Sequence, residues 1–125
     1  MSPDEAITDL KRISVQIDET VLCDHAGEVL ASTRSDAAVA ERLARLAVEI
    51  WEAADAGRRD LGRDALSQVE LSTTLGSVFV VRDDERIALG TTGPDPTVGL
   101  VFYDLKSCLH AVARSAGAEE TVGQA

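Results

Sequence analysis

The chain has 125 residues and a hydrophobic fraction of 45%, which suits one globular domain with a single core. Its formal net charge is −10, which argues against binding to nucleic acid or to an anionic membrane surface, because both need clustered Lys and Arg. The cysteines Cys23 and Cys108 lack the spacing of a disulfide framework, and the first residues lack an apolar signal segment. We therefore expect buried free thiols and a cytoplasmic protein.

The N-terminal segment is predicted to form a short amphipathic helix over about residues 3–14. Ser2 is a favourable N-cap residue, and Pro3 is well suited to the first turn of a helix. Ile7 and Leu10 then fall on one face of the helix. This face is expected to pack against the rest of the domain.

The next segment, "VLCDHAGEVLAST", carries the clearest turn signal in the chain. Asp24 opens and Gly27 closes a four-residue turn between two apolar runs. Asp is favourable at the first position of such a turn, and Gly adopts positive φ without strain. The pattern predicts an antiparallel hairpin with strands at about 19–24 and 28–33.

The segment from Ala37 to Gly57, "AAVAERLARLAVEIWEAADAG", is predicted to be a long helix with Ser35 as its N-cap. Projected at about 100° per residue, its apolar residues form two neighbouring stripes. One stripe is expected to cover the sheet and consists of Val39, Leu43, Leu46, Ile50 and Ala54. The other is expected to face outward and consists of Ala40, Ala44, Ala47 and Trp51, with Val48 further round.

The second half of the chain is predicted to contain three strands and a closing helix. Residues 67–73 alternate between apolar and polar and form the first of these strands, a natural edge strand. A second hairpin turns at Asp83, and an apolar pattern from Val98 predicts the last helix. The order α-β-β-α-β-β-β-α predicts an α+β fold, a five-stranded antiparallel sheet flanked by helices. We expect one domain over residues 1–116 and a disordered tail over 117–125.

No common enzyme motif occurs in the chain: it lacks the phosphate-binding loop, the nucleophile elbow and the dinucleotide fingerprint. The only histidines, His25 and His110, are predicted on a surface turn and on the last helix, so a metal site with Cys23 or Cys108 is not expected. An unfamiliar catalytic group around Asp104, Cys108 and His110 is the remaining enzyme hypothesis, but that side of the helix is expected to be core. We expect a protein without enzymatic activity, cofactor or metal.

The outward stripe of the long helix predicts a homodimer. An alanine-rich face allows another backbone to approach closely, and Trp51 is a large anchor that rarely stays in water. Burying one Trp removes about 150–250 Å² from water, or on the order of 4–6 kcal/mol before the costs of association. Two-fold symmetry closes such an interface, and pairing the edge strand at 67–73 with its twin protects it from aggregation.

With these elements in this order, the chain resembles the roadblock family, the dynein light chain type domains that also occur in bacterial partners of small GTPases. The resemblance covers about Pro3 to Ala116 and is carried by "VLCDHAGEVLAST", "VELSTTLGSVFVVRDDERIALGTT" and "VGLVFYDLKSCLHAV". It implies a roadblock/profilin-like sandwich that dimerises through its second helices and third strands. Mapped onto this chain, the interface would comprise Ala40, Ala44, Ala47, Val48, Trp51, Gln68, Val69, Glu70 and Leu71.

The resemblance also implies a function, namely binding a Ras-like small GTPase and modulating or scaffolding its nucleotide cycle. The possible GTPase contacts are Glu41, Arg45, Glu49 and Glu52, which also fit a plain solvated helix face. The alternative is a small-molecule sensor of the same shape with a pocket between sheet and helix. Against it, the predicted core offers few polar groups to orient a ligand.

Overall fold

The computed structural model describes the backbone of residues 1–124 and the side chains of residues 1–114. Within these residues the elements follow the predicted order, which confirms the α+β class. They are α1 (Pro3–Ile13), β1 (Ile17–Asp24), β2 (Val29–Ser32), α2 (Ala37–Asp60), β3 (Gln68–Ser72), β4 (Ser77–Arg82), β5 (Arg86–Thr92) and α3 (Val98–Gln124).

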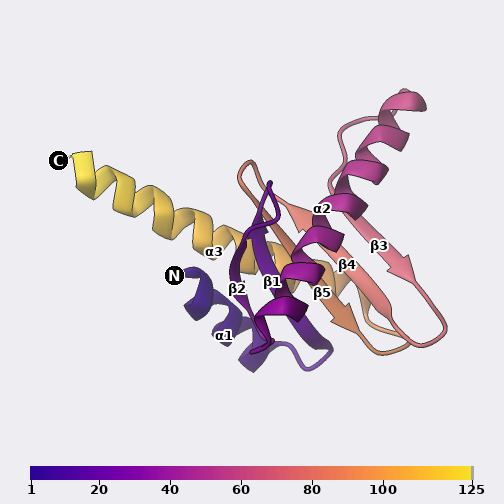
Figure 1. The fold of residues 1–125 in the computed structure, drawn as a ribbon, viewed down its shortest axis with the longest axis horizontal. Coiled ribbons are helices and arrows are strands. Elements are labelled where there is room, and N and C mark those ends of the chain that lie inside the picture. Colours follow the sequence, from indigo (N-terminus) through magenta and orange to yellow (C-terminus); the bar gives the residue numbers. More distant parts are fainter. Residues whose placement is uncertain (125) are drawn as a thin grey trace.

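The strands form one five-stranded sheet in the order β2-β1-β5-β4-β3, with every neighbouring pair antiparallel (Figure 1). The two hairpins are joined side by side through β1 and β5, where Val21 is opposite Leu89. β3 pairs only with β4 among the described strands, so its outer side is an open edge of the sheet. The prediction that this strand lies at an edge is confirmed.

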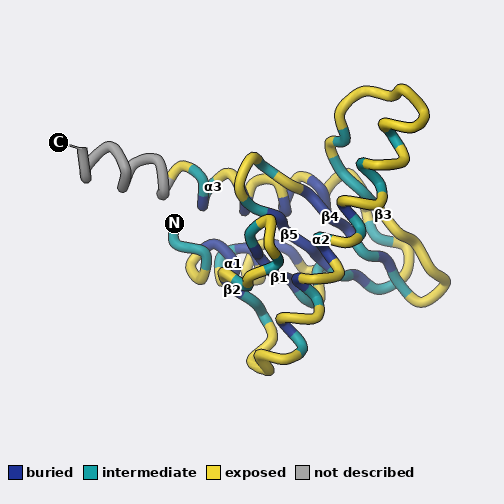
Figure 2. The backbone as a smooth tube through the Cα atoms, turned by 45° about the horizontal axis from the view of Figure 1, so that its top comes forward, coloured by how far each residue is buried: buried dark blue, intermediate teal, exposed yellow. Residues whose placement is uncertain are grey.

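Helices cover both faces of the sheet. α1 and α3 lie together on one face, and α2 lies alone on the other (Figure 1). Alternate side chains of each central strand pack against the helices on opposite faces of the sheet, because successive side chains of a strand point to opposite faces. Leu22 and Phe79 pack under α1 and α3, whereas Val21 and Val80 pack under α2. Figure 2 shows the resulting buried band between the exposed helix surfaces.

Local capping and turn chemistry explain where most elements begin. Ser2 and Glu5 form a capping box at α1, and the Asp24 carboxylate accepts hydrogen bonds from two backbone amides across the first hairpin turn. Gly27 closes that turn with a φ of 85°, which suits glycine. α2 is capped by Asp36 and not by the expected Ser35, since the Asp36 carboxylate accepts from the amide of Ala38 at 2.9 Å.

Both long helices run past their predicted ends. α2 passes through Gly57 to Asp60, and Asp55 forms ion pairs with Arg58 at 2.7 Å and Arg59 at 3.0 Å along this last turn. The hydrogen bond from Arg58 is the main cause that lowers the pKa of Asp55.

α3 continues to Gln124, and extending an existing helix costs less than starting a new one. It therefore includes most of the predicted tail, while Ala125 lies outside the described residues. No helix in the described part of the chain is both long and apolar enough to cross a lipid bilayer.

Candidate dimer interface

The alanine and tryptophan stripe of α2 packs against the sheet. Ala44 and Ala47 are 0% exposed, Ala40 is 4% exposed and Trp51 is 5% exposed. Trp51 belongs to a buried cluster with Val80 and Leu89 of the sheet. The prediction that this stripe faces outward is therefore wrong, and these four side chains leave no surface for a second subunit. Their small size has a different use, since alanines let the α2 backbone approach the sheet closely.

The stripe of α2 that was expected to cover the sheet is the one that reaches the surface. Leu46 is 40% exposed, and Val39, Leu43, Ile50 and Ala54 are half-buried. Leu43 and Ile50 pack against the buried cluster that contains Trp51 but remain partly exposed. The helix thus has two apolar stripes, as the sequence indicates, but their roles are exchanged. The outward stripe is rotated by about 100° from the predicted position.

The outward stripe lies on the side of α2 that faces β3. A Cβ added at Gly27 in the β1–β2 turn would lie 3.7 Å from side-chain atoms of both Arg45 and Val48, so that side of α2 is next to the turn. The stripe with Leu46 lies on the other side of the helix, and its members Leu43 and Ile50 pack against the same buried cluster as Val69 of β3. Val48 is half-buried beside the turn, on the side of α2 away from Leu46.

The four residues predicted on the edge strand divide between the two faces of the sheet. Val69 is opposite Val80, and Leu71 is opposite Val78, so both lie on the α2 face. Leu71 is 48% exposed. Gln68 and Glu70 lie on the other face, where the Gln68 side chain accepts a hydrogen bond from Lys106 of α3.

A set of partly exposed apolar side chains therefore lies on the α2 face of the molecule, on α2 itself and on the edge strand and its neighbours. We call it the edge surface, and it consists of Leu43, Leu46 and Ile50 of α2, Leu66 of the preceding loop, Val69 and Leu71 of β3 and Val78 of β4. It combines exposed apolar side chains with an unpaired strand backbone, and both favour covering by another protein chain.

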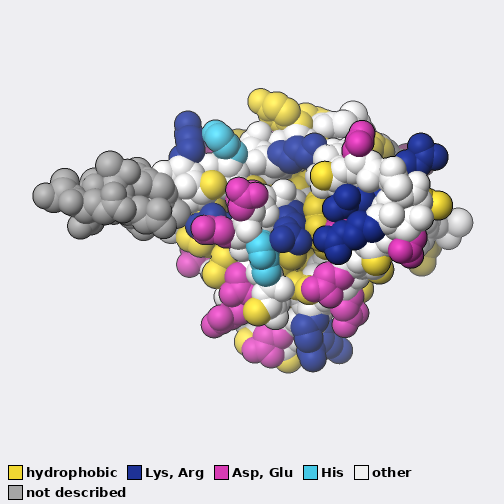
Figure 3. All heavy atoms as spheres, turned by 90° about the horizontal axis from the view of Figure 1, so that it is seen from above, with side chains coloured by type: hydrophobic (Ala, Val, Ile, Leu, Met, Phe, Trp, Pro, Cys, Tyr) yellow, Lys and Arg dark blue, Asp and Glu magenta, His cyan; other side chains and the backbone are white. Residues whose placement is uncertain are grey.

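The predicted GTPase contacts are all on the solvent side of α2. Glu41, Arg45, Glu49 and Glu52 are exposed, and no ion pair involves them among residues 1–114. The face seen in Figure 3 mixes acidic, basic and apolar side chains and has no broad patch of a single charge.

The chemically reactive side chains of the described region do not converge on a site of catalysis. Burial raises the pKa of both the Cys23 and the Cys108 thiols to about 11, so neither is a thiolate at neutral pH. Asp104 and Cys108 are buried, whereas His110 is exposed, so the structure does not bring these three together. Within the described residues, no group of His, Cys, Asp and Glu is arranged to hold a metal ion.

Comparison with known proteins identifies the family. The sequence model of the Roadblock/LC7 domain matches residues 5–92, which is most of the chain. The chain belongs to the Roadblock/LC7 domain family. The match includes α2 and β3, so the edge surface lies within the Roadblock/LC7 part of the chain. The comparison with curated proteins gave no match.

Several solved structures share the fold. A Roadblock/LC7 domain from Streptomyces avermitilis is 16% identical with a TM-score of 0.82, covering 90% of this chain and 96% of that one. A structure described as MglB with a tetrameric arrangement is 19% identical with a TM-score of 0.74, covering 88% of this chain and 84% of that one. The gliding protein MglB from Thermus thermophilus is 18% identical with a TM-score of 0.71, covering 91% of this chain and 90% of that one.

Proposed function

We propose that this protein is a cytoplasmic, non-catalytic homodimer that binds a Ras-like small GTPase and modulates or scaffolds its nucleotide cycle. The observation that carries the proposal is the edge surface, an open strand next to an exposed apolar helix stripe. Membership of the Roadblock/LC7 family supports the proposal, and so does the tetrameric arrangement described for one structure of the same fold.

The proposed dimer pairs β3 with the β3 of a second copy, so that one sheet runs through both subunits. Each outer backbone amide and carbonyl of this edge then gains a hydrogen-bond partner. The same two-fold axis brings the two α2 helices together, where Leu46 of each copy is covered. Leu46 and Leu71 are the largest exposed apolar contributors, and they replace Trp51 and the buried alanines in the interface that we propose.

The charged face of α2 is the proposed GTPase contact. In the dimer two copies of Glu41, Glu49 and Glu52 would stand close together on the solvent side of the paired helices. A partner surface rich in Arg or Lys would complement them and would associate faster at low ionic strength. Arg45 on the same side would meet an acidic group of the partner.

The dimer is tested by light scattering during gel filtration of the wild type and of Leu46→Glu. The wild type is expected to be a dimer at tens of micromolar, and Leu46→Glu a folded monomer, because a charge would be buried without a partner at the interface. Val15→Glu is the matched control, since Val15 is 96% exposed in the α1–β1 loop and should leave the dimer intact. A monomeric wild type, or a dimeric Leu46→Glu, would contradict the proposal.

The GTPase contact is tested by isothermal titration of the dimer with a Ras-like GTPase encoded by the same genome, loaded with GDP or with a GTP analogue. Reversing the charge in Glu49→Lys and Glu52→Lys should weaken binding while leaving the dimer unchanged. Asp4→Lys, at an exposed position of α1 on the other face of the sheet, is the control for added positive charge. Equal affinity of all variants would remove α2 as the contact, and absence of binding to every such GTPase would refute this function.

A further inference from the structure

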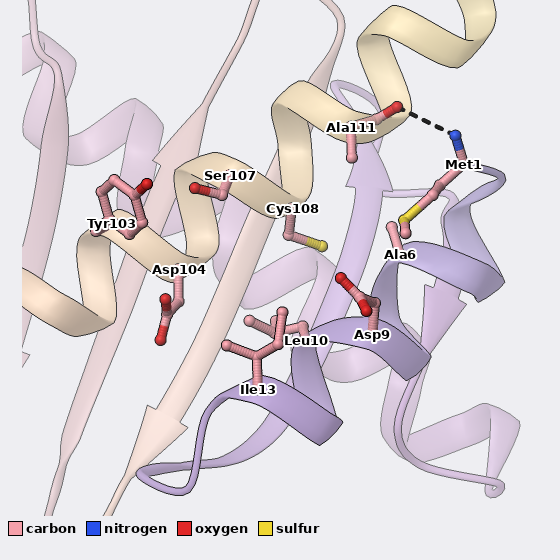
Figure 4. A pocket seen from close by; sticks show the side chains of 10 residues that line it. All are labelled: Met1, Ala6, Asp9, Leu10, Ile13, Tyr103, Asp104, Ser107, Cys108 and Ala111. Carbon is pink, nitrogen blue, oxygen red and sulfur yellow. Dashed lines mark hydrogen bonds between the residues drawn. The ribbon is translucent and has the colours of Figure 1, made fainter.

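The groove between α1 and α3 contains a pocket on the sheet face opposite to α2. Its cavity has a volume of about 260 Å³, and Figure 4 shows the side chains that line it. Its walls are largely apolar and are provided by Leu10 and Ile13 of α1 and by Tyr103 and Ala111 of α3. Ile13 is 60% exposed and Tyr103 is 67% exposed, so apolar surface remains open to a ligand at the pocket mouth.

The Asp104 carboxylate is the polar group that distinguishes this pocket from a simple packing defect. Asp104 is only 8% exposed, and its side chain projects from α3 toward α1 (Figure 4). Among residues 1–114 it has no hydrogen bond and no ion pair. Its oxygens are not sealed from solvent, so they remain accessible from the pocket. A cationic group there would pair with a carboxylate that is shielded from most of the solvent.

Other charged groups lie around the pocket. Asp9 of α1 lies beside Cys108, and its negative charge contributes to the raised pKa of that thiol. Arg12 pairs with Asp9, but the Arg12 side chain is 77% exposed and does not line the pocket. No Arg, Lys or His is among the lining residues, but the α-ammonium of Met1 lines the pocket and donates a hydrogen bond to the Ala111 carbonyl at 3.4 Å (Figure 4). Asp9 is paired with Arg12, so Asp104 is the lining carboxylate that has no cationic partner among the described residues.

We propose that this pocket binds a small organic cation, a primary amine or amidine carried on a short aromatic body. The cationic group pairs with Asp104, and the body lies against Leu10, Ile13 and Tyr103. The volume fits this class, because a cavity of about 150 Å³ holds one benzene molecule. The remaining space accommodates a two-carbon chain and its ammonium group. The site shares no residue with the edge surface, so it does not depend on the proposed dimer or GTPase.

The test is a titration of the ¹⁵N-labelled full chain, followed by amide chemical shifts, with phenethylamine and benzamidine as probes. The neutral isostere 2-phenylethanol is the control ligand, because it has the same ring and chain without the charge. We expect both cations to shift amides of α1 and α3, and 2-phenylethanol to bind at least about tenfold more weakly.

Three variants locate the binding determinant. Asp104→Asn keeps the shape but removes the charge, and it should weaken phenethylamine at least about tenfold. Ser107→Phe, at an exposed position that lines the pocket, should block binding without altering the core. Asp84→Asn, in the exposed β4–β5 turn, removes one negative charge elsewhere and should bind like the wild type.

The proposal is overturned if neither cation binds at millimolar concentration, or if 2-phenylethanol binds as well as phenethylamine. It is also overturned if Asp104→Asn retains full affinity, or if the shifted amides lie outside α1 and α3. Leu46→Glu should bind phenethylamine like the wild type, so a failure of the dimer and a failure of this pocket are separate results.

Discussion

The exchanged roles of the two α2 stripes give a direct prediction. Replacing Trp51 with Ala should destabilise each subunit, whereas Leu46→Glu should dissociate the dimer and leave each subunit folded. Trp51 is 5% exposed against the sheet, with the Arg82 guanidinium 6.0 Å from its ring, and Leu46 is 40% exposed at the edge surface. The two residues lie on the same helix, so the comparison separates burial within a subunit from burial between subunits.

The magnitude follows from the area that Trp51 buries. At about 25 cal/mol per Å², a buried area of about 150–250 Å² corresponds to about 4–6 kcal/mol as an upper bound. Trp-to-Ala changes in cores cost about 3–5 kcal/mol, and that is the loss we expect in the free energy of unfolding. Surface changes such as Leu46→Glu should stay within about 0.5 kcal/mol for the isolated subunit.

Urea denaturation followed by circular dichroism, at several protein concentrations, measures both effects. A folded dimer gains stability with concentration, so the wild-type midpoint should rise with protein concentration. Trp51→Ala should lower the midpoint at every concentration, and Leu46→Glu should remove the concentration dependence. If Trp51→Ala does not fold, Trp51→Phe gives a smaller change in the same direction.

The fluorescence of the wild type provides an independent check, because Trp51 is the single tryptophan. Its emission should be that of a buried indole and should not change when the protein is diluted through dimer dissociation. A red shift on dilution, or a stable but monomeric Trp51→Ala, would place Trp51 between subunits and refute the orientation of α2 described above.

Two further predictions concern the fold itself. Gly76→Ala should destabilise the protein by about 1–3 kcal/mol in thermal or urea unfolding, because the added Cβ would clash with the backbone oxygen of Thr92. The control is Gly57→Ala on α2, where a Cβ would meet open space. It should be neutral or should stabilise the protein by up to about 1 kcal/mol. An equal loss for both would contradict the close approach at Gly76. The buried thiols Cys23 and Cys108 have pKa values raised from 9.0 to about 11, so the stability they contribute is complete below about pH 9 and is lost as the pH rises through about 11. The stability of Cys23→Ala/Cys108→Ala, measured between pH 8 and pH 11, should show a smaller decline, and an equal decline would assign the pH dependence to other groups.

The sequence predicts the elements well because their signals are local. Asp24 and Gly27 define the first turn through their own backbone preferences, and the alternation around Val69 defines an edge strand. The orientation of α2 is not a local property. Both of its stripes are apolar, and periodicity alone does not distinguish Ala44 from Leu43 as the residue beneath the helix. The spacing between helix and sheet decides it, and that distance depends on the whole packed layer.

The pocket between α1 and α3 shows a similar limit. Asp104 occupies the core-facing side of the last helix, and an acidic residue on an apolar face is a visible signal in the sequence. Its meaning depends on the partner helix, because α1 supplies apolar contacts and a second carboxylate, Asp9, but no cation that reaches Asp104. Only the packing of these two distant segments reveals the unpaired charge.

The open side of β3 connects the concentration of the protein with its risk of misassembly. A lone subunit displays an unsatisfied row of peptide groups beside Leu71, and any extended polypeptide can add to it as a further strand. In the proposed dimer the second copy covers that row. Dilution or a change in the α2 stripe would then expose it again, so the abundance of the chain would govern its exposure to misassembly.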